Sequence, residues 1–148
     1  MQRKIIPDIV TGQTINSAKV DTTVMDAAKK MASANIAAIT VEDDDGKLIG
    51  IITERDITQR VVAKGLNAET TSVLDVMTKN PDTLSPNDSA GDALELMQSR
   101  NYRHLPVTED GKCVAMVSVR DLYKAAKEQL EENIRETEAF VFGDRYGA

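Results

Sequence analysis

An internal repeat constrains the fold of this chain more than any other feature of its sequence. The dipeptide Asp26-Ala27 recurs as Asp92-Ala93, and matched positions continue in the same order to the end of the second copy. The first copy has one extra residue in its Asp-rich loop. Further matched positions are Met31 and Met97, Ser33 and Ser99, Asn35 and Asn101, Val41 and Val107, Gly46-Lys47 and Gly111-Lys112, Thr53 and Ser118, Arg55 and Arg120, and Asp56 and Asp121. Matches over this many segments indicate a duplicated folding unit.

Each copy predicts a helix, a strand, a tight hairpin turn, a second strand and a second helix. Thr23 and either Asp88 or Ser89 are suitable caps for the first helices, whose apolar residues follow helical spacing. Asp-Gly turns separate the strands, as in hairpins. The predicted strands are 37–41 and 48–52 in the first copy and 104–107 and 113–118 in the second; the second helices are 54–63 and 119–138.

One such unit cannot bury both faces of its own sheet, but two units can cover each other. We therefore predict an α/β fold of the α+β type, in which two pseudo-symmetric β-α-β-β-α repeats pack sheet to sheet. The predicted division is a first repeat at 8–66, a linker with a short helical turn at 67–82, a second repeat at 83–127, and a helix extension and tail at 128–148. Because most of the aromatic residues lie in the tail, we expect it to dock on a surface.

The composition excludes several classes of protein. The net charge of −6 opposes general binding to nucleic acid, which depends on neutralising phosphates. A single cysteine, Cys113, excludes an intramolecular disulfide and a cysteine-based zinc cluster. No apolar run is long enough to span a bilayer, and the first residues do not resemble a signal peptide. These features predict a cytoplasmic protein without membrane contact.

The chemistry of the repeat lies in a hydroxyl-x-x-Asp motif, Thr53 to Asp56 and Ser118 to Asp121. One interpretation is structural: hydroxyl and carboxylate cap the helix that begins there. The other is functional: the carboxylate accepts hydrogen bonds from a vicinal diol such as a ribose, and the helix N-terminus favours a phosphate nearby. The motif fits both interpretations.

The motifs in this order resemble a tandem pair of CBS domains, a Bateman module, over about residues 8–127. The likeness rests on Leu105-Pro106-Val107, on the Gly-Lys hairpins and on Ile51-Ile52-Thr53 followed by Asp56. The segment from Thr53 to Gly65 is similar to that of small stand-alone bacterial CBS-pair proteins, which bind AMP-type or NAD-type nucleotides. The resemblance implies a non-catalytic sensor with no catalytic cofactor and no metal. Its adenosyl ligand would be AMP, ATP or NAD, with S-adenosylmethionine as a further candidate.

The resemblance also implies two clefts between the repeats. In such pairs an aspartate of one copy holds the ribose, and the segment leading into the other copy's first strand encloses the base. Carried over to this chain, the first site comprises Asp121 and Ser118 with Thr11, Thr14, Asn16 and Ala37. The second comprises Asp56 and Thr53 with Asn80, Asp82 and Arg103, and His104 follows where family members place basic residues toward phosphates.

The first copy departs from the family pattern. Ala37-Ala38 stands where the second copy has Arg103-His104, and Thr40 replaces the proline. The two clefts are therefore expected to differ. Arg103 and His104 could instead point into a dimer interface, and His104 could also be a strand residue satisfied by a backbone carbonyl.

Three functions are open at this point. The first is an adenine-nucleotide sensor that acts on an unknown regulated protein. The second is a ligand-free assembly module whose aspartates only cap helices. The third is a hydrolase using Asp56 and Asp121, which lacks a supporting nucleophile or metal motif. A homodimer is expected, because a single pair would leave helix faces uncovered, with apolar residues Val24, Ala28, Met31, Leu94 and Met97.

Overall fold

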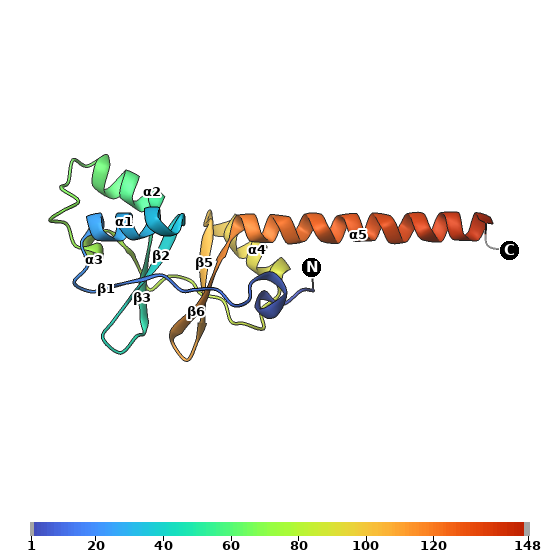
Figure 1. Ribbon diagram of the computed structural model, residues 1–148, viewed down its shortest axis with the longest axis horizontal. Coiled ribbons are helices and arrows are strands. Elements are labelled where there is room, and N and C mark those ends of the chain that lie inside the picture. Colours follow the sequence, from blue (N-terminus) through green and yellow to red (C-terminus); the bar gives the residue numbers. More distant parts are fainter. Residues whose placement is uncertain (1, 147–148) are drawn as a thin grey trace.

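The computed structural model describes residues 2–146 and contains two sheets, one for each repeat (Figure 1). The first sheet has the strand order β1-β2-β3-β4, and the second consists of β5 and β6. The strands are β1 (Ser17–Lys19), β2 (Ala38–Glu42), β3 (Leu48–Thr53), β4 (Thr78–Lys79), β5 (His104–Glu109) and β6 (Lys112–Ser118). The antiparallel hairpins β2-β3 and β5-β6 are the predicted pairs of strands.

The first helix of each repeat begins and ends in the same way. The hydroxyl of Thr23 accepts a hydrogen bond from the backbone N–H of Asp26 at the start of α1 (Val24–Ala34). Ser89 does the same for α4 (Ala90–Arg100). Both helices end at an asparagine in the left-handed conformation, Asn35 and Asn101, a residue that tolerates this geometry.

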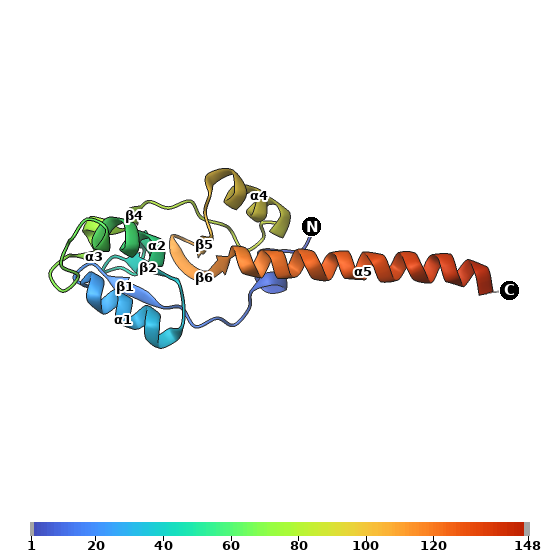
Figure 2. The same cartoon turned by 90° about the horizontal axis from the view of Figure 1, so that it is seen from above.

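The second helices differ greatly in length. In the first repeat, α2 (Glu54–Ile57) continues as a wider helical turn (Thr58–Val62), and Gly65 follows at φ 67°. In the second repeat, α5 (Val119–Tyr146) has 28 residues, because no glycine or proline interrupts it before Gly143. Figures 1 and 2 show α5 extending far beyond the two sheets.

The two hairpins lie side by side, as the repeat predicts (Figure 1). The backbone N–H of Leu48 donates a hydrogen bond to the carbonyl oxygen of Gly111, at 2.9 Å, and so links the two turns. Gly46 and Gly111 both have a φ of 79°, a conformation that glycine adopts without steric cost. The predicted fold class, two repeats packed sheet to sheet, is confirmed.

The segment before β1 packs in the core of the second repeat, and the linker between the repeats packs in the core of the first. Ile5 and Val10, which both precede β1, are buried in the core of the second repeat. Val73, Val76 and Met77, in α3 (Val73–Val76) and just after it, are buried in the core of the first. Each core contains residues from a segment that lies outside its own repeat. The two repeats therefore form one interlocked body.

Matching contacts hold these crossing segments. The N–H of Ile5, at the start of a helical turn (Ile5–Ile9), donates to the carbonyl of Asp88 at 2.9 Å. The N–H of Val73 donates to the carbonyl of Thr22 at 3.0 Å. These two contacts are therefore related by the same approximate twofold symmetry as the repeats.

A side chain completes the second sheet. In the first sheet, β4 pairs with β3 through Thr78 and Ile51. In the second, the amide side chain of Gln13 takes that place: its Nε2 donates to the carbonyl of Met116 at 3.0 Å, and its Oε1 accepts from the Met116 N–H at 2.9 Å. Gln13 thereby satisfies the edge of β6 without a strand.

The structure corrects the expected dimer surface. Val24, Met31 and Met97 are buried within the chain, and Ala28 and Leu94 are partly buried. The crossing segments and the sheets already cover these helix faces, so they are not the uncovered surface that the sequence suggested. Within residues 2–146, no helix is long and apolar enough to cross a membrane.

Candidate functional site

Two clefts open between the repeats, where β3 and β6 pass into the second helices. The Asp56 cleft, with a volume of about 290 Å³, is lined by residues of β3, α2 and the segments 78–82 and 100–105. The Asp121 cleft, with a volume of about 420 Å³, is lined by residues 13–16, residues around β2, and the β6–α5 junction. These volumes lie near the lower end of the range for small-molecule sites, roughly 300–1,000 Å³.

Both aspartates cap their helices with the same geometry. The backbone N–H of Thr53 donates to Oδ2 of Asp56 at 2.9 Å, and the Asp56 N–H donates to the Thr53 hydroxyl at 3.2 Å. The corresponding distances for Ser118 and Asp121 are also 2.9 and 3.2 Å. The capping interpretation of the repeated motif is therefore confirmed in both repeats.

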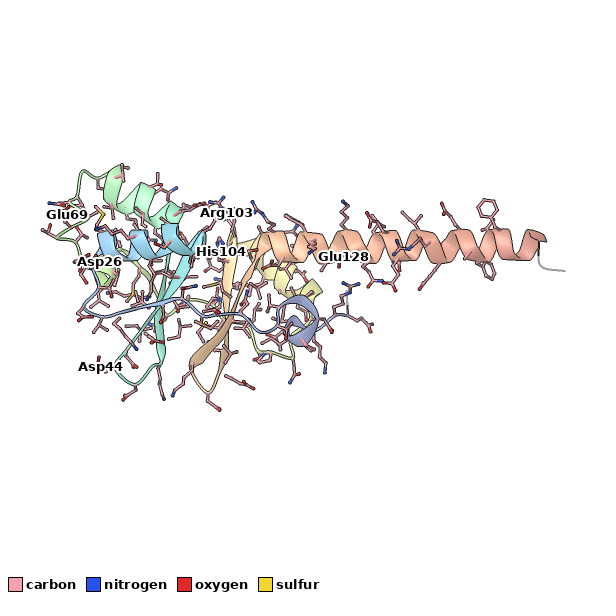
Figure 3. All side chains as sticks on the ribbon, viewed as in Figure 1. Asp26, Asp44, Glu69, Arg103, His104 and Glu128 are labelled. Carbon is pink, nitrogen blue, oxygen red and sulfur yellow. The ribbon has the colours of Figure 1, made fainter. Side chains whose placement is uncertain are left out.

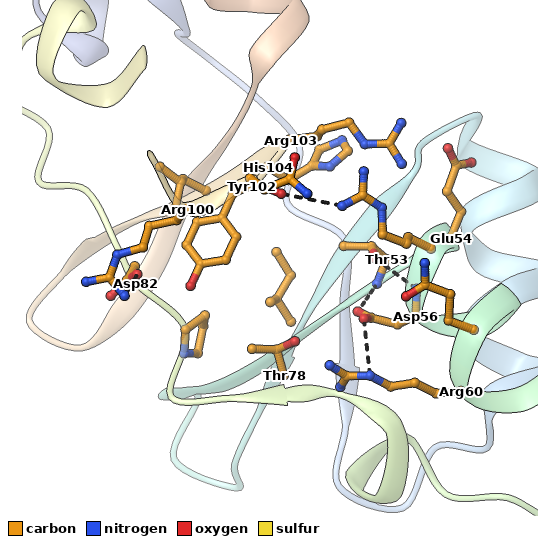
Figure 4. Close-up of a pocket in the computed structure, with 16 residues that line it drawn as sticks. Thr53, Glu54, Asp56, Arg60, Thr78, Asp82, Arg100, Tyr102, Arg103 and His104 are labelled. Atoms are coloured by element: carbon orange, nitrogen blue, oxygen red, sulfur yellow. Dashed lines mark hydrogen bonds and ion pairs between the residues drawn. The ribbon is translucent and has the colours of Figure 1, made fainter. Parts of the chain in front are cut away.

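Capping occupies only one oxygen of each carboxylate. Oδ1 of Asp56 lies 3.7 Å from Nε of Arg60, one turn further along the helix (Figure 4). Among the side chains that the structure describes, no hydrogen-bond donor contacts Oδ1 of Asp121. Since both aspartates also line a cleft, capping the helix and binding a ligand are compatible.

Basic residues from both repeats surround the Asp56 cleft. Arg55 comes from α2. Arg60 follows in the next helical turn, and Arg100 and Arg103 come from the opposite repeat (Figure 4). Nη1 of Arg55 donates to the carbonyl of Asn101 at 3.4 Å and so connects the two walls. This arrangement favours an anionic ligand.

An acidic residue and a phenol complete the far wall of the Asp56 cleft. Asp82 lies 3.9 Å from Arg100, as measured from Oδ2 to Nη1. Burial and the neighbouring Asp82 carboxylate raise the pKa of Tyr102 above its usual value. Tyr102 is therefore a neutral hydrogen-bonding group at physiological pH.

The Asp121 cleft has a different lining. Ile36, Ala37, Ala38 and Met116 give it a largely apolar wall. Thr40 also lines it, is 1% exposed, and has a hydroxyl without a hydrogen-bond partner among the described residues. Burial raises the pKa of the Cys113 thiol, so this residue is not an activated nucleophile.

Three residues form a wall shared by both clefts: Glu54, Arg103 and His104. Figure 3 shows Arg103 and His104 at the junction of the two repeats. Burial, and then the positive charge of Arg103, lower the pKa of His104, while Glu54 and Asp121 act in the opposite direction. His104 is therefore predominantly neutral at pH 7 and can donate or accept a hydrogen bond.

The structure brings together most of the residues expected at each site. Thr14, Asn16, Ala37, Ser118 and Asp121 line the Asp121 cleft. Thr53, Asp56, Asp82, Arg103 and His104 line the Asp56 cleft.

Two expected residues, Thr11 and Asn80, lie outside both linings. Thr11 is exposed. Asn80 is exposed in a turn at φ 46°, where its backbone N–H donates to the carbonyl of Ile49 at 3.1 Å. Thr11 lies two residues before Gln13, which lines the Asp121 cleft, and Asn80 lies next to Pro81, which lines the Asp56 cleft.

Sequence reasoning missed several lining residues, including Glu54, Tyr102 and Arg100. Glu54 lies inside the repeated motif and could have been found there. Tyr102 and Arg100 lie at the end of a helix and carried no motif. No cluster of metal-ligating side chains occurs among the described residues.

The sequence profile of the CBS domain matches residues 3–63 and 73–128. The chain belongs to the CBS domain family. It is 33% identical over 127 residues to the CBS domain-containing protein CBSX3, mitochondrial, of Arabidopsis thaliana, which covers 83% of this chain and 62% of the relative. It is 40% identical over 101 residues to the protein YlbB of Bacillus subtilis (strain 168), which covers 67% of each chain.

Other relatives are much longer than the matched segment. The CBS domain-containing protein CBSCBSPB5 of Arabidopsis thaliana is 36% identical over 120 residues, covering 81% of this chain but only 22% of the relative. The chain therefore spans about a fifth of the length of that relative.

Solved structures share the fold. A CBS-domain containing protein of Agrobacterium tumefaciens has a TM-score of 0.72 at 32% identity, covering 78% of this chain and 91% of that one. The CBS domain pair of protein MJ0100, in complex with 5′-methylthioadenosine and S-adenosyl-L-methionine, has a TM-score of 0.73 at 27% identity, covering 82% and 94%. A CBS domain protein of Pyrobaculum aerophilum complexed with AMP has a TM-score of 0.69 at 24% identity, covering 75% and 85%.

Proposed function

We propose that this chain is a non-catalytic sensor that binds an adenosyl ligand in the clefts between its repeats and regulates another polypeptide. The observation that carries the proposal is the pair of aspartates, Asp56 and Asp121. Each caps a helix through Oδ2 and lines a cleft between the repeats. A carboxylate placed in this way accepts hydrogen bonds from the two hydroxyls of a ribose.

The family supports an adenosyl group as the common part of the ligand. The MJ0100 pair, whose fold this chain shares, is in complex with two adenosine derivatives. In this chain, the apolar residues Ile36 and Met116 of the Asp121 cleft provide a surface for a base. The walls from both repeats would then contact one ligand, so binding would couple to their relative position.

The two clefts favour ligands of different charge. The Asp56 cleft has four arginines, and two of them, Arg55 and Arg103, form no ion pair with the described residues. The Asp121 cleft has Arg103 and Arg120 and a neutral His104. We therefore assign nucleotides with phosphates, such as AMP, ATP or NAD, to the Asp56 cleft. The less charged adenosyl compounds belong to the Asp121 cleft.

The test is calorimetric titration of the full chain with AMP, ATP, NAD, 5′-methylthioadenosine and S-adenosylmethionine. A charge-assisted hydrogen bond contributes about 1.5–3 kcal/mol, so Asp56→Asn and Asp121→Asn should each weaken one class of ligand roughly ten- to a hundredfold. Asp26→Asn is the matched control, because Asp26 follows its capping hydroxyl at the same spacing but lines neither cleft.

Absence of binding by every ligand would favour the second candidate, a ligand-free assembly module. The double capping geometry is the specific observation in its favour, because it gives both aspartates a structural role. Equal binding by the wild-type chain and both aspartate variants would also contradict the proposed contacts.

A further inference from the structure

Most of α5 lies beyond contact with the rest of the molecule (Figures 1 and 2). Its first turns are anchored by the buried residues Leu122 and Ala125, and Arg3 forms ion pairs with Glu128 at 3.3 Å and Glu132 at 3.7 Å. Every residue from 130 to 143 is exposed. A solitary helical segment of this length is marginally stable in water, so α5 would gain from a packing partner.

One face of α5 carries an apolar stripe. Four large apolar residues lie on one side of the helix, and each is about half exposed or more: Tyr123 (51%), Leu130 (61%), Ile134 (49%) and Val141 (52%). At 3.6 residues per turn they fall within an arc of about 40° and form a line about 27 Å long. We call these four residues the α5 stripe. Their spacing is that of helices that pair along a seam.

We propose that the α5 stripe packs against the same stripe of a second copy of this chain, with the two helices antiparallel. A twofold axis midway between Leu130 and Ile134 places Leu130 against Ile134 of the partner subunit. The same axis places Tyr123 against Val141 of the partner subunit. Every member of the stripe then meets an apolar residue, as a self-complementary twofold interface requires.

The charges along α5 support this occupant and this direction. Lys124 and Glu138 flank the stripe on the same side. The antiparallel arrangement therefore brings Lys124 close to Glu138 of the partner subunit, and the twofold axis repeats this contact on the other half of the pair. Lys127, which lies in line with the stripe, would face Thr137 of the partner subunit. A parallel pair would instead place two copies of Lys127 side by side, which is repulsive.

The opposite flank fits the same register. Among the residues whose side chains the structure describes, Phe140 is the most exposed large apolar residue, at 72%. In the antiparallel pair it lies beside Ala126 of the partner subunit, where the small side chain leaves room for the ring. This interface differs from the helix faces suggested by the sequence, and it does not depend on the proposed nucleotide binding.

Sedimentation equilibrium of the full chain tests the interface. The wild-type chain should be a dimer, and the double variant Leu130→Glu with Ile134→Glu should raise the dimer dissociation constant at least about a hundredfold. Both positions are exposed, so the fold of the repeats should survive. Ala139→Glu, an exposed position on the opposite side of the same helix, is the matched control and should leave the dimer unchanged.

Cross-linking tests the direction of the helices in a Cys113→Ala background. Asn133→Cys lies beside the proposed axis and should link to itself with a short bis-maleimide, whereas Val141→Cys should not, because its two copies lie about 27 Å apart along the pair. A monomeric wild-type chain would overturn the proposal. A dimer unaffected by the two glutamates, or self-linking at Val141→Cys rather than Asn133→Cys, would also overturn it.

Discussion

Asp56 and Asp121 combine a structural contact with a place in a cleft. The carboxylate of each accepts a backbone hydrogen bond at 2.9 Å through Oδ2, and this contact holds the start of the next helix. The sequence predicted this cap from local spacing alone, because hydroxyl and carboxylate lie three residues apart. It could not show from spacing that the carboxylates face the other repeat, since that depends on how the two units pack.

The buried hydroxyl of Thr40, a residue that lines the Asp121 cleft, gives a prediction about the stability of the fold. The hydroxyl has no partner among the described residues, and a buried unsatisfied polar group costs about 1–3 kcal/mol. Thr40→Val, which keeps the shape and removes the hydroxyl, should therefore raise the free energy of unfolding by about 1 kcal/mol in urea titrations. A lower stability of the variant would show that the hydroxyl is hydrogen-bonded in solution.

His104 gives a prediction about pH. Burial and Arg103 lower its pKa in the folded chain, so the unfolded chain binds the proton more strongly. The free energy of unfolding should be highest above pH 6.5 and should fall as the pH drops below that value. His104→Gln should flatten the difference in urea stability between pH 7.5 and 5.5. Because His104 is the only histidine, an unchanged difference would contradict this cause.

At the scale of elements, the helix starts were predictable and some other features were not. Thr23 caps α1 as predicted, and Ser89, one of the two candidates that the sequence offered beside Asp88, caps α4. The replacement of an edge strand by the side chain of Gln13 left no pattern, because a single glutamine in a loop has no periodicity. The place of Tyr102 in the Asp56 cleft was also missed, since it follows from the packing of two repeats rather than from a motif.

The cap of α4 can be tested directly. Ser89→Ala removes the acceptor for the backbone N–H of Asp92 and should lower the free energy of unfolding by about 0.5–2 kcal/mol. Ser33→Ala is the control, because Ser33 is exposed within α1, and its change should be neutral or slightly stabilising. Equal effects of the two substitutions in urea titrations would contradict the role of the cap.

At the scale of the whole molecule, the crossing segments join the two repeats. The repeat predicted two units packed sheet to sheet, and that architecture is confirmed. It did not predict that Ile5 belongs to the second core and Val73 to the first. The two segments have similar apolar patterns, so nothing local indicates which core each one enters.

Ile5 therefore links the stability of the two halves. Ile5→Ala should lower the free energy of unfolding by about 2–5 kcal/mol, because the side chain is fully buried. Hydrogen exchange should show faster opening in β5 and β6, far from Ile5 in sequence. Faster exchange confined to the first repeat would show that Ile5 packs elsewhere.

The central claim is that Asp56 and Asp121 bind a ribose, and a crystal structure with the tightest-binding nucleotide tests it most directly. The account predicts the ribose hydroxyls within hydrogen-bond distance of one of these carboxylates, while the Oδ2 cap remains in place. A nucleotide bound outside both clefts, or bound in a cleft with the carboxylate not contacting the sugar, would contradict it.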